Sequence, residues 1–170
     1  GNIILDHSYF DDEEFGPGWA IDDIPYPYSA PISAIAFHDN KVELQFKPGA
    51  KAGDYSRMTM IPENSYLRIV NNVMTVPNGN ATLIDSDADP RSGVIDMQGS
   101  IAMAPPTSKV NTDESMSTIG LSIHDPVQFF LQLCKQRLEK MGIRIRGSLL
   151  RNEMLNRSEE HTSELQSPYV

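Results

Sequence analysis

Cysteine is nearly absent from this chain: Cys134 is the only one, so no disulfide can form within the chain and the redox compartment stays open. Apolar runs fall short of the roughly 20 residues of a membrane-spanning helix, which predicts no transmembrane segment. The four histidines are scattered and do not have the spacing of metal ligands. We therefore expect no metal site and no cofactor.

Basic residues are also scarce, with 14 Lys and Arg against 23 Asp and Glu and a net charge of −9. We interpret the sequence as lacking a cluster of Lys and Arg. Without such a cluster a protein cannot release counterions from a polyanion, which argues against nucleic acid and anionic membranes as partners. Small molecules, peptides and cationic groups are better candidates. A content of 39 % hydrophobic and 22 % charged residues is typical of a folded globular domain.

The end of the chain, residues 157–170, is polar and has neither helical nor strand periodicity. Its first part, RSEEHTSELQS, resembles the translation of a common DNA-sequencing adapter. We therefore predict that residues 157–170 are an artefactual, unstructured tail, and we set them aside.

Alternating apolar and polar residues predict a β-rich region from about residue 32 to 118. In SAIAFHDNKVELQFKPG, two β-rich runs surround Asp39-Asn40 and predict a hairpin, with Val42, Leu44 and Phe46 on its buried face. Further strands are expected in NIIL, SYLRIVNNVMTV, ATLIDS, GVIDMQGSIAM and STIGLSI.

A helix is predicted over about residues 125–141. Asp125 is its N-cap, Pro126 occupies the first turn, and Gly142 ends it. The residues expected on its apolar face are Val127, Phe130, Leu131, Cys134, Leu138 and Met141. Because STIGLSI precedes this helix and IRIRGSLL follows it, we expect a crossover unit with a parallel strand pair, which the N-terminal strand could join. The predicted fold class is α+β.

Most residues with catalytic potential have a plainer interpretation. Asp6-His7-Ser8 contains the residue types of a hydrolase triad, but neighbours on an extended segment point to opposite faces. Asp85, Asp87 and Asp89 resemble part of a calcium loop that lacks its glycine and its final glutamate, and an acidic surface turn is the better interpretation. Cys134 lies on the apolar helix face and is expected to act as a small buried hydrophobe.

The segment GWAIDDIPYPYSAP (18–31) is the strongest candidate for a binding site. Its three prolines exclude a helix or an interior strand. Asp22 and Asp23 can hold a cation, and Tyr26 and Tyr28 offer flat apolar walls with polar tips. A carboxylate beside an aromatic ring suits an ammonium group on an aliphatic stem, although a packed turn with solvated acids would look the same in sequence.

Two runs carry a family resemblance: GNIILDHSYFDDEEFGPGWAIDDIPYPYSAPISA at the start, and QFFLQLCKQRLEKMGIRIRGSLL later. Both resemble segments of the D-alanyl-D-alanine carboxypeptidases/endopeptidases of the class C, low-molecular-mass penicillin-binding proteins. The likeness reaches from Gly1 to about Asn156 and is weak in the middle. It implies an α/β accessory domain made of residues 1–31 and 119–156, with a substrate loop and an inserted β-rich domain over 32–118.

The resemblance also implies a function: a periplasmic or cell-envelope serine hydrolase that trims peptidoglycan stem peptides and is acylated by β-lactams. In that family an acidic residue and an aromatic five positions later contact the diamino-acid side chain of the stem peptide. The matching positions here are Asp23 and Tyr28, which are the predicted substrate-binding residues.

The three catalytic motifs of the family, Ser-x-x-Lys, Ser-x-Asn and Lys-Thr/Ser-Gly, do not occur in this sequence. Lys51-Ala52-Gly53 has the outline of the third but lacks its hydroxyl. We therefore expect an internal fragment of such an enzyme that has no catalytic residues, is inactive alone and would bind β-lactams only as part of its full-length parent. The alternative is a stand-alone β-rich binding module without catalysis.

Overall fold

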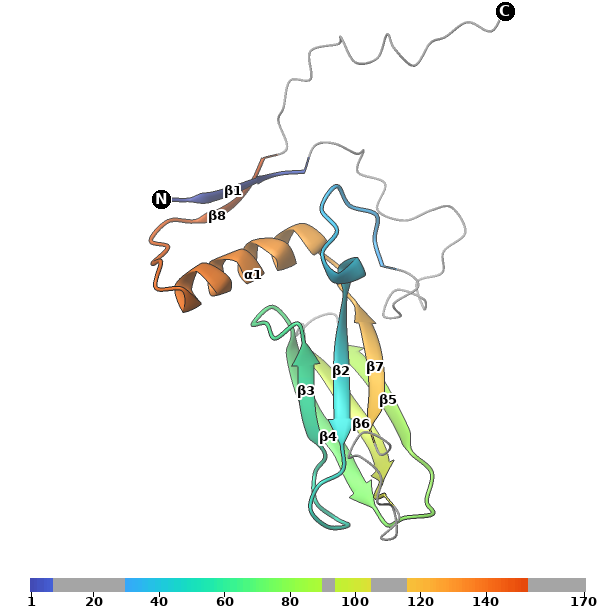
Figure 1. Ribbon diagram of the computed structural model, residues 1–170. Coiled ribbons are helices and arrows are strands. Elements are labelled where there is room, and N and C mark those ends of the chain that lie inside the picture. Colours follow the sequence, from blue (N-terminus) through green and yellow to red (C-terminus); the bar gives the residue numbers. More distant parts are fainter. Residues whose placement is uncertain (8–29, 90–93, 105–115, 153–170) are drawn as a thin grey trace, which may run out of the picture.

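The computed structural model describes residues 1–7, 30–89, 94–104 and 116–152. It contains one α-helix, a short 3-10 turn and eight strands within these ranges, which confirms the α+β class (Figure 1). The elements are β1 (Ile3–Asp6), η3 (His38–Asn40), β2 (Lys41–Lys47), β3 (Arg57–Ile61), β4 (Arg68–Val76), β5 (Leu83–Asp89), β6 (Val94–Ala102), β7 (Ser117–Ser122), α1 (Pro126–Lys140) and β8 (Leu149–Asn152).

Two three-stranded sheets form a sandwich, one with the strand order β3-β2-β7 and the other β4-β6-β5 (Figure 1). Along β2 the apolar residues alternate with polar ones, and Val42, Leu44 and Phe46 are fully buried, as the sequence pattern predicted. Strands β4, β6 and β7 lie in the runs expected for them, β5 begins in ATLIDS but continues to Asp89, and β3 was not predicted. The core between the sheets consists of Val42, Leu44, Phe46, Val73, Met97, Ile101, Leu121 and Ile123, joined by Phe129 of α1.

The predicted hairpin around Asp39-Asn40 is wrong. Residues 32–37 form no strand, and β2 pairs instead with β3 and β7, antiparallel to both. The turn before β2 explains the difference, because His38, Asp39 and Asn40 all have a positive φ, between 51° and 55°. Three successive left-handed residues turn the chain away from an antiparallel return, and these residue types tolerate that conformation better than most.

The expected parallel pairing of the strands around the helix is also wrong. Strand β7 pairs antiparallel with β2, and β8 pairs in parallel with β1, with Ile3 opposite Leu149. The N-terminal strand, expected to join that parallel pair, pairs in parallel with β8 but not with β7. Helix α1 therefore carries the chain from β7, at the edge of one sandwich sheet, to β8, whose partner is β1.

The division into an accessory domain and an inserted domain stays a prediction. Its boundary near residue 118 falls inside β7, all of whose residues lie opposite residues of β2 in the sandwich.

Helix α1 begins and ends as predicted. The Asp125 side chain accepts a hydrogen bond from the Gln128 N–H at 2.9 Å, and Pro126 follows in the first turn. At the other end, Gly142 has a φ of +84°, its N–H donates to Glu139, and the Ile143 N–H donates to Leu138. This pair of bonds is a Schellman motif, which satisfies the last carbonyls of the helix.

The apolar face of α1 is only partly the one expected. Val127 and Leu131 are buried, but so is Phe129, which the spacing did not select, and Met141 is 64 % exposed. Phe129 packs edge-on against Tyr66 with 5.6 Å between the ring centroids and belongs to the sandwich core. The helix start is therefore buried in the sandwich core, whereas Met141, which follows the last turn, is not.

Candidate functional site

The two predicted substrate-binding residues, Asp23 and Tyr28, lie in residues 8–29, outside the described part of the chain, as do Asp22 and Tyr26. The structure describes the flanks of that segment: β1 with His7 before it, and residues 30–40 after it. These flanks determine where the candidate loop leaves the fold and where it returns.

The returning flank is held by one buried side chain. Asn40 is 6 % exposed, its Nδ2 donates to the Pro31 carbonyl at 3.2 Å, and its Oδ1 accepts from the Phe37 N–H at 3.2 Å. Its own carbonyl accepts from the Ile123 N–H at 2.8 Å. Asn40 therefore fixes both ends of residues 31–37 to the point where β2 begins and β7 has ended.

An aromatic contact joins the same flank to α1. The rings of Phe37 and Phe130 meet edge to face, with their centroids 6.0 Å apart. Phe37 remains 41 % exposed, so it covers the first turns of the helix without being enclosed itself. The return point of the loop and the start of α1 thus form one packed unit.

The start of α1 carries a cluster of polar groups from three parts of the chain. Arg151 of β8 donates to the Asp125 carboxylate and forms an ion pair with it, while the Asp125 carboxylate also caps the helix. Tyr66, from the loop between β3 and β4, lies against the same turn. Burial, and then the negative charge of Asp125, raises the pKa of the Tyr66 hydroxyl. We call Tyr66, Asp125 and Arg151 the helix-start cluster.

The flank that precedes the candidate loop is β1, which forms a two-stranded sheet with β8. The Ile3 N–H donates to the Ser148 carbonyl at 3.0 Å, and the Ser148 N–H donates to the Asn2 side chain at 3.0 Å. Asp6 is exposed and His7 half-buried, as expected for neighbours on opposite faces, and Ser8 lies outside the described residues. The Nε2 atom of His7 is buried and has no hydrogen-bond partner among the described residues.

The other sequence candidates show no assembled chemistry. Asp85 and Asp87 lie on β5 and not in a turn, with Asp87 opposite Asp96 of β6. Across the described ranges, no group of three or more His, Cys, Asp or Glu side chains could hold a metal ion. Nor does any helix in these ranges have the length and apolar character needed to cross a bilayer.

Two further candidates keep their plainer interpretations. Lys51 and Gly53 lie in a turn that two hydrogen bonds close. The Lys51 N–H donates to the Asp54 carboxylate at 3.1 Å, and the Gly53 N–H donates to the Thr75 carbonyl at 2.9 Å. Cys134 is a free thiol on α1 that is half-buried and not fully buried as expected, and burial raises its pKa, which makes it a poor nucleophile.

Sequence reasoning did not find Asn40, Phe37, Tyr66 or Arg151. The three left-handed residues His38-Asp39-Asn40 are of a type that tolerates this conformation, so they carried a weak signal. Nothing local marks Tyr66 or Arg151, because their partner Asp125 is distant in sequence.

Comparison with known proteins gives the same family over nearly the whole chain. The family model described as D-Ala-D-Ala carboxypeptidase 3 (S13) matches residues 1–168, a range that extends into the segment 157–170 set aside above. A D-alanyl-D-alanine carboxypeptidase from an Actinomadura species is 26 % identical over 157 residues, covering 88 % of this chain and 27 % of the relative.

Two solved structures share the fold. The crystal structure of penicillin-binding protein 4 from Haemophilus influenzae superimposes with a TM-score of 0.65 at 14 % identity, over 92 % of this chain and 33 % of that one. The same protein complexed with a β-lactam gives a TM-score of 0.50 at 11 % identity, over 75 % and 27 %. This chain thus spans a third or less of the length of these relatives. Since the family model covers nearly every residue, the chain belongs to the D-Ala-D-Ala carboxypeptidase 3 (S13) family.

Proposed function

We propose that this chain is the non-catalytic part of a serine-type D-Ala-D-Ala carboxypeptidase/endopeptidase that acts on peptidoglycan stem peptides in the cell envelope. The observation that carries the proposal is the family match over residues 1–168 of a sequence in which no serine has a lysine three residues later or an asparagine two residues later. Such a part contributes recognition of the substrate and leaves bond cleavage to residues elsewhere in a longer protein.

Segment 18–31 supplies the recognition. Asp23 pairs with the distal ammonium of diaminopimelate, and the Tyr28 ring covers the methylenes of that side chain. The fold supports this role through the flanks, since Asn40 holds the Pro31 carbonyl and the packed ring of Phe37 holds the return point against α1. A loop with anchored ends and three prolines loses little entropy when it binds a ligand.

The first test is labelling with a fluorescent penicillin. The 170-residue chain is expected to take up no covalent label, because an acyl-enzyme needs an activated serine and the Ser-x-x-Lys motif is absent. The longer protein in which this chain is encoded, run alongside as the control, is expected to be labelled. Stable label on the short chain contradicts the non-catalytic role, and no label on the longer protein favours the binding module over the enzyme.

The second test addresses the proposed side-chain contact in the longer enzyme. Asp23→Ala is expected to lower kcat/KM for diaminopimelate-containing peptides by about 10- to 100-fold, the effect of losing one charge-assisted hydrogen bond. Turnover of small acyl-D-Ala-D-Ala analogues, which lack the ammonium, should change little. Asp22→Ala is the matched control for loss of a neighbouring charge. Equal losses on both substrates, or a larger loss in the Asp22 variant, rule out the assignment to Asp23.

A further inference from the structure

Although the net charge of the chain is negative, one end of the molecule is basic. Residues 126–152 contain six basic side chains and one acidic one, Glu139, a net charge of +5, so the remaining residues carry −14. The basic ones are Lys135, Arg137, Lys140, Arg144, Arg146 and Arg151. The interpretation of the sequence as lacking a Lys/Arg cluster is therefore wrong for this region.

Most of these cations are not used within the fold. Arg151 pairs with Asp125, and Lys140 pairs with Glu63 at 2.9 Å but keeps 51 % of its side chain exposed. Arg137, Arg144 and Arg146 are exposed and form no ion pair with any residue in the described ranges. Three cations with no internal partner therefore face solvent around the end of α1.

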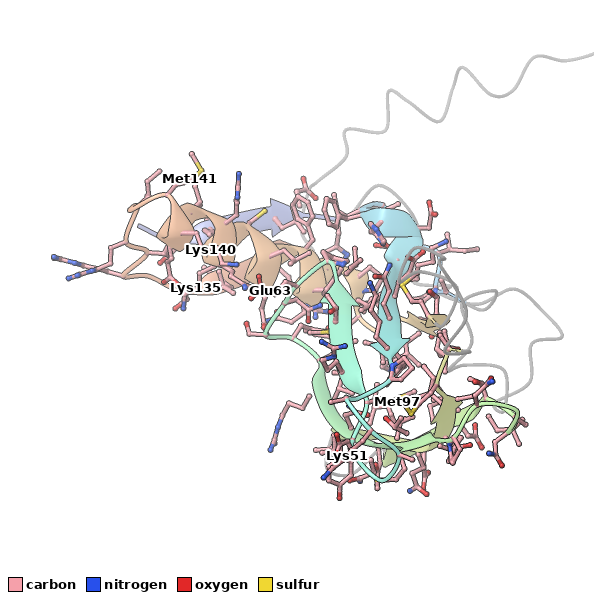
Figure 2. The ribbon with its side chains drawn as sticks, turned by 60° about the horizontal axis from the view of Figure 1, so that its bottom comes forward. Lys51, Glu63, Met97, Lys135, Lys140 and Met141 are labelled. Atoms are coloured by element: carbon pink, nitrogen blue, oxygen red, sulfur yellow. The ribbon has the colours of Figure 1, made fainter. Side chains whose placement is uncertain are left out.

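Two apolar side chains project among them. Met141 is 64 % exposed and Ile143 is 49 % exposed, and the Schellman turn that ends the helix holds both. Figure 2 shows Met141 and Lys140 together at the end of α1 that lies away from the sandwich. We call residues 137–146 the basic tip.

We propose that the basic tip docks onto the surface of a bilayer that contains anionic lipid headgroups. Arg137, Arg144 and Arg146 meet the phosphates, and Met141 and Ile143 enter the interface between headgroups and acyl chains. Exposed apolar residues bordered by Lys and Arg are typical of proteins that bind at the membrane–water interface. Burial of the apolar area and attraction of the cations to anionic lipids both strengthen that binding. A soluble polyanion would need the cations alone, and the exposed apolar pair therefore favours the bilayer.

The acidic remainder of the chain does not prevent this contact. Helix α1 has 15 residues, so about 22 Å separates its two ends. That span exceeds the Debye length of about 8 Å at physiological ionic strength, so charges around the start of α1 are screened at the tip. Glu139 is the acidic residue within the tip, and Glu63, from the loop between β3 and β4, reaches the tip but is paired with Lys140.

Sedimentation with lipid vesicles tests the proposal. The 170-residue chain is mixed with vesicles of phosphatidylglycerol and phosphatidylcholine, and separately with phosphatidylcholine alone. Arg144→Gln with Arg146→Gln is expected to weaken binding to the anionic vesicles about 30-fold, and Met141→Gln with Ile143→Gln about tenfold. The matched control is Lys51→Gln with Arg68→Gln, which removes the same charge from exposed side chains of the sandwich and should leave binding unchanged.

Each outcome decides between the bilayer and its rivals, provided that circular dichroism shows every variant folded. Binding to anionic vesicles that high salt weakens and both tip variants lose supports the proposal. No binding overturns it, as does equal loss in the tip and control variants. Binding to soluble polyphosphate as tight as to vesicles, unchanged in the Met141/Ile143 variant, also overturns it and identifies a soluble polyanion as the ligand.

Discussion

Single residues at the start of α1 hold together parts of the chain that are far apart in sequence. Tyr66 comes from the sandwich, Asp125 caps the helix, and Arg151 lies in β8. Because one carboxylate serves both the cap and the ion pair, it couples the helix to the β1–β8 sheet. The half-buried Tyr66 ring completes the contact by packing on Phe129.

The pKa shift of Tyr66 makes stability depend on pH in the alkaline range. Burial and the Asp125 charge raise this pKa above its ordinary value of 10.0, so the folded chain holds the proton more tightly than the unfolded chain. The stability that this shift contributes is fully present below pH 10.0 and is lost as the pH rises through the pKa of Tyr66 in the folded chain. Urea unfolding on either side of pH 10.0 should show a smaller loss in Tyr66→Phe than in the wild type.

Tyr55→Phe is the control, since that side chain is 60 % exposed, and it should follow the wild type across the same pH range. Parallel losses in the wild type and in Tyr66→Phe contradict the prediction.

At the scale of elements, the sequence predicts those whose signals are local. Asp125-Pro126 and Gly142 delimit α1, and the alternation of Val42, Leu44 and Phe46 identifies β2 and its buried face. Pairing depends on distant residues, which is why the partners of β7 and β8 were not predicted. The candidate loop was identified from its composition, but the anchor Asn40 was not, because its role depends on contacts with Pro31 and Ile123.

Strand β6 shows how one element requires glycine. Gly99 has a φ of +118°, and a Cβ there would overlap the Leu83 carbonyl oxygen of β5. Gly99→Ala should therefore lower the free energy of unfolding by about 3 kcal/mol, through backbone strain and overlap together. Gly53→Ala is the matched control, because Gly53 has a φ of +92° with open space around it and should lose only about 1 kcal/mol. Equal losses in urea unfolding would show that the approach of β5 is unimportant.

The whole molecule has two regions of unequal packing, linked by α1. The sandwich encloses the core, and Phe129 inserts the start of the helix into it. In the part of the chain that the structure describes, the β1–β8 sheet has two strands of four residues each, and Ile4 and Leu150 on it are 63 % and 40 % exposed. A two-stranded sheet has marginal stability unless another element covers it. Here α1 contacts both strands, so the stability of the sheet depends on the helix.

The rates of amide hydrogen exchange should therefore differ between the regions of this chain in a definite order. The amides of β2 and β6, each the central strand of its sheet, should exchange slowest, through global unfolding. Those of β1 and β8 should exchange on the order of 100-fold faster through local opening. The first turns of α1 should follow the sandwich, because Phe129 is fully buried in its core, whereas the last turn should follow β8. Mass spectrometry of peptides from the two ends of the helix measures the difference. Equal protection of β1, β8 and β2 would mean that the chain opens as a single cooperative unit and that α1 transmits the stability of the sandwich along its whole length.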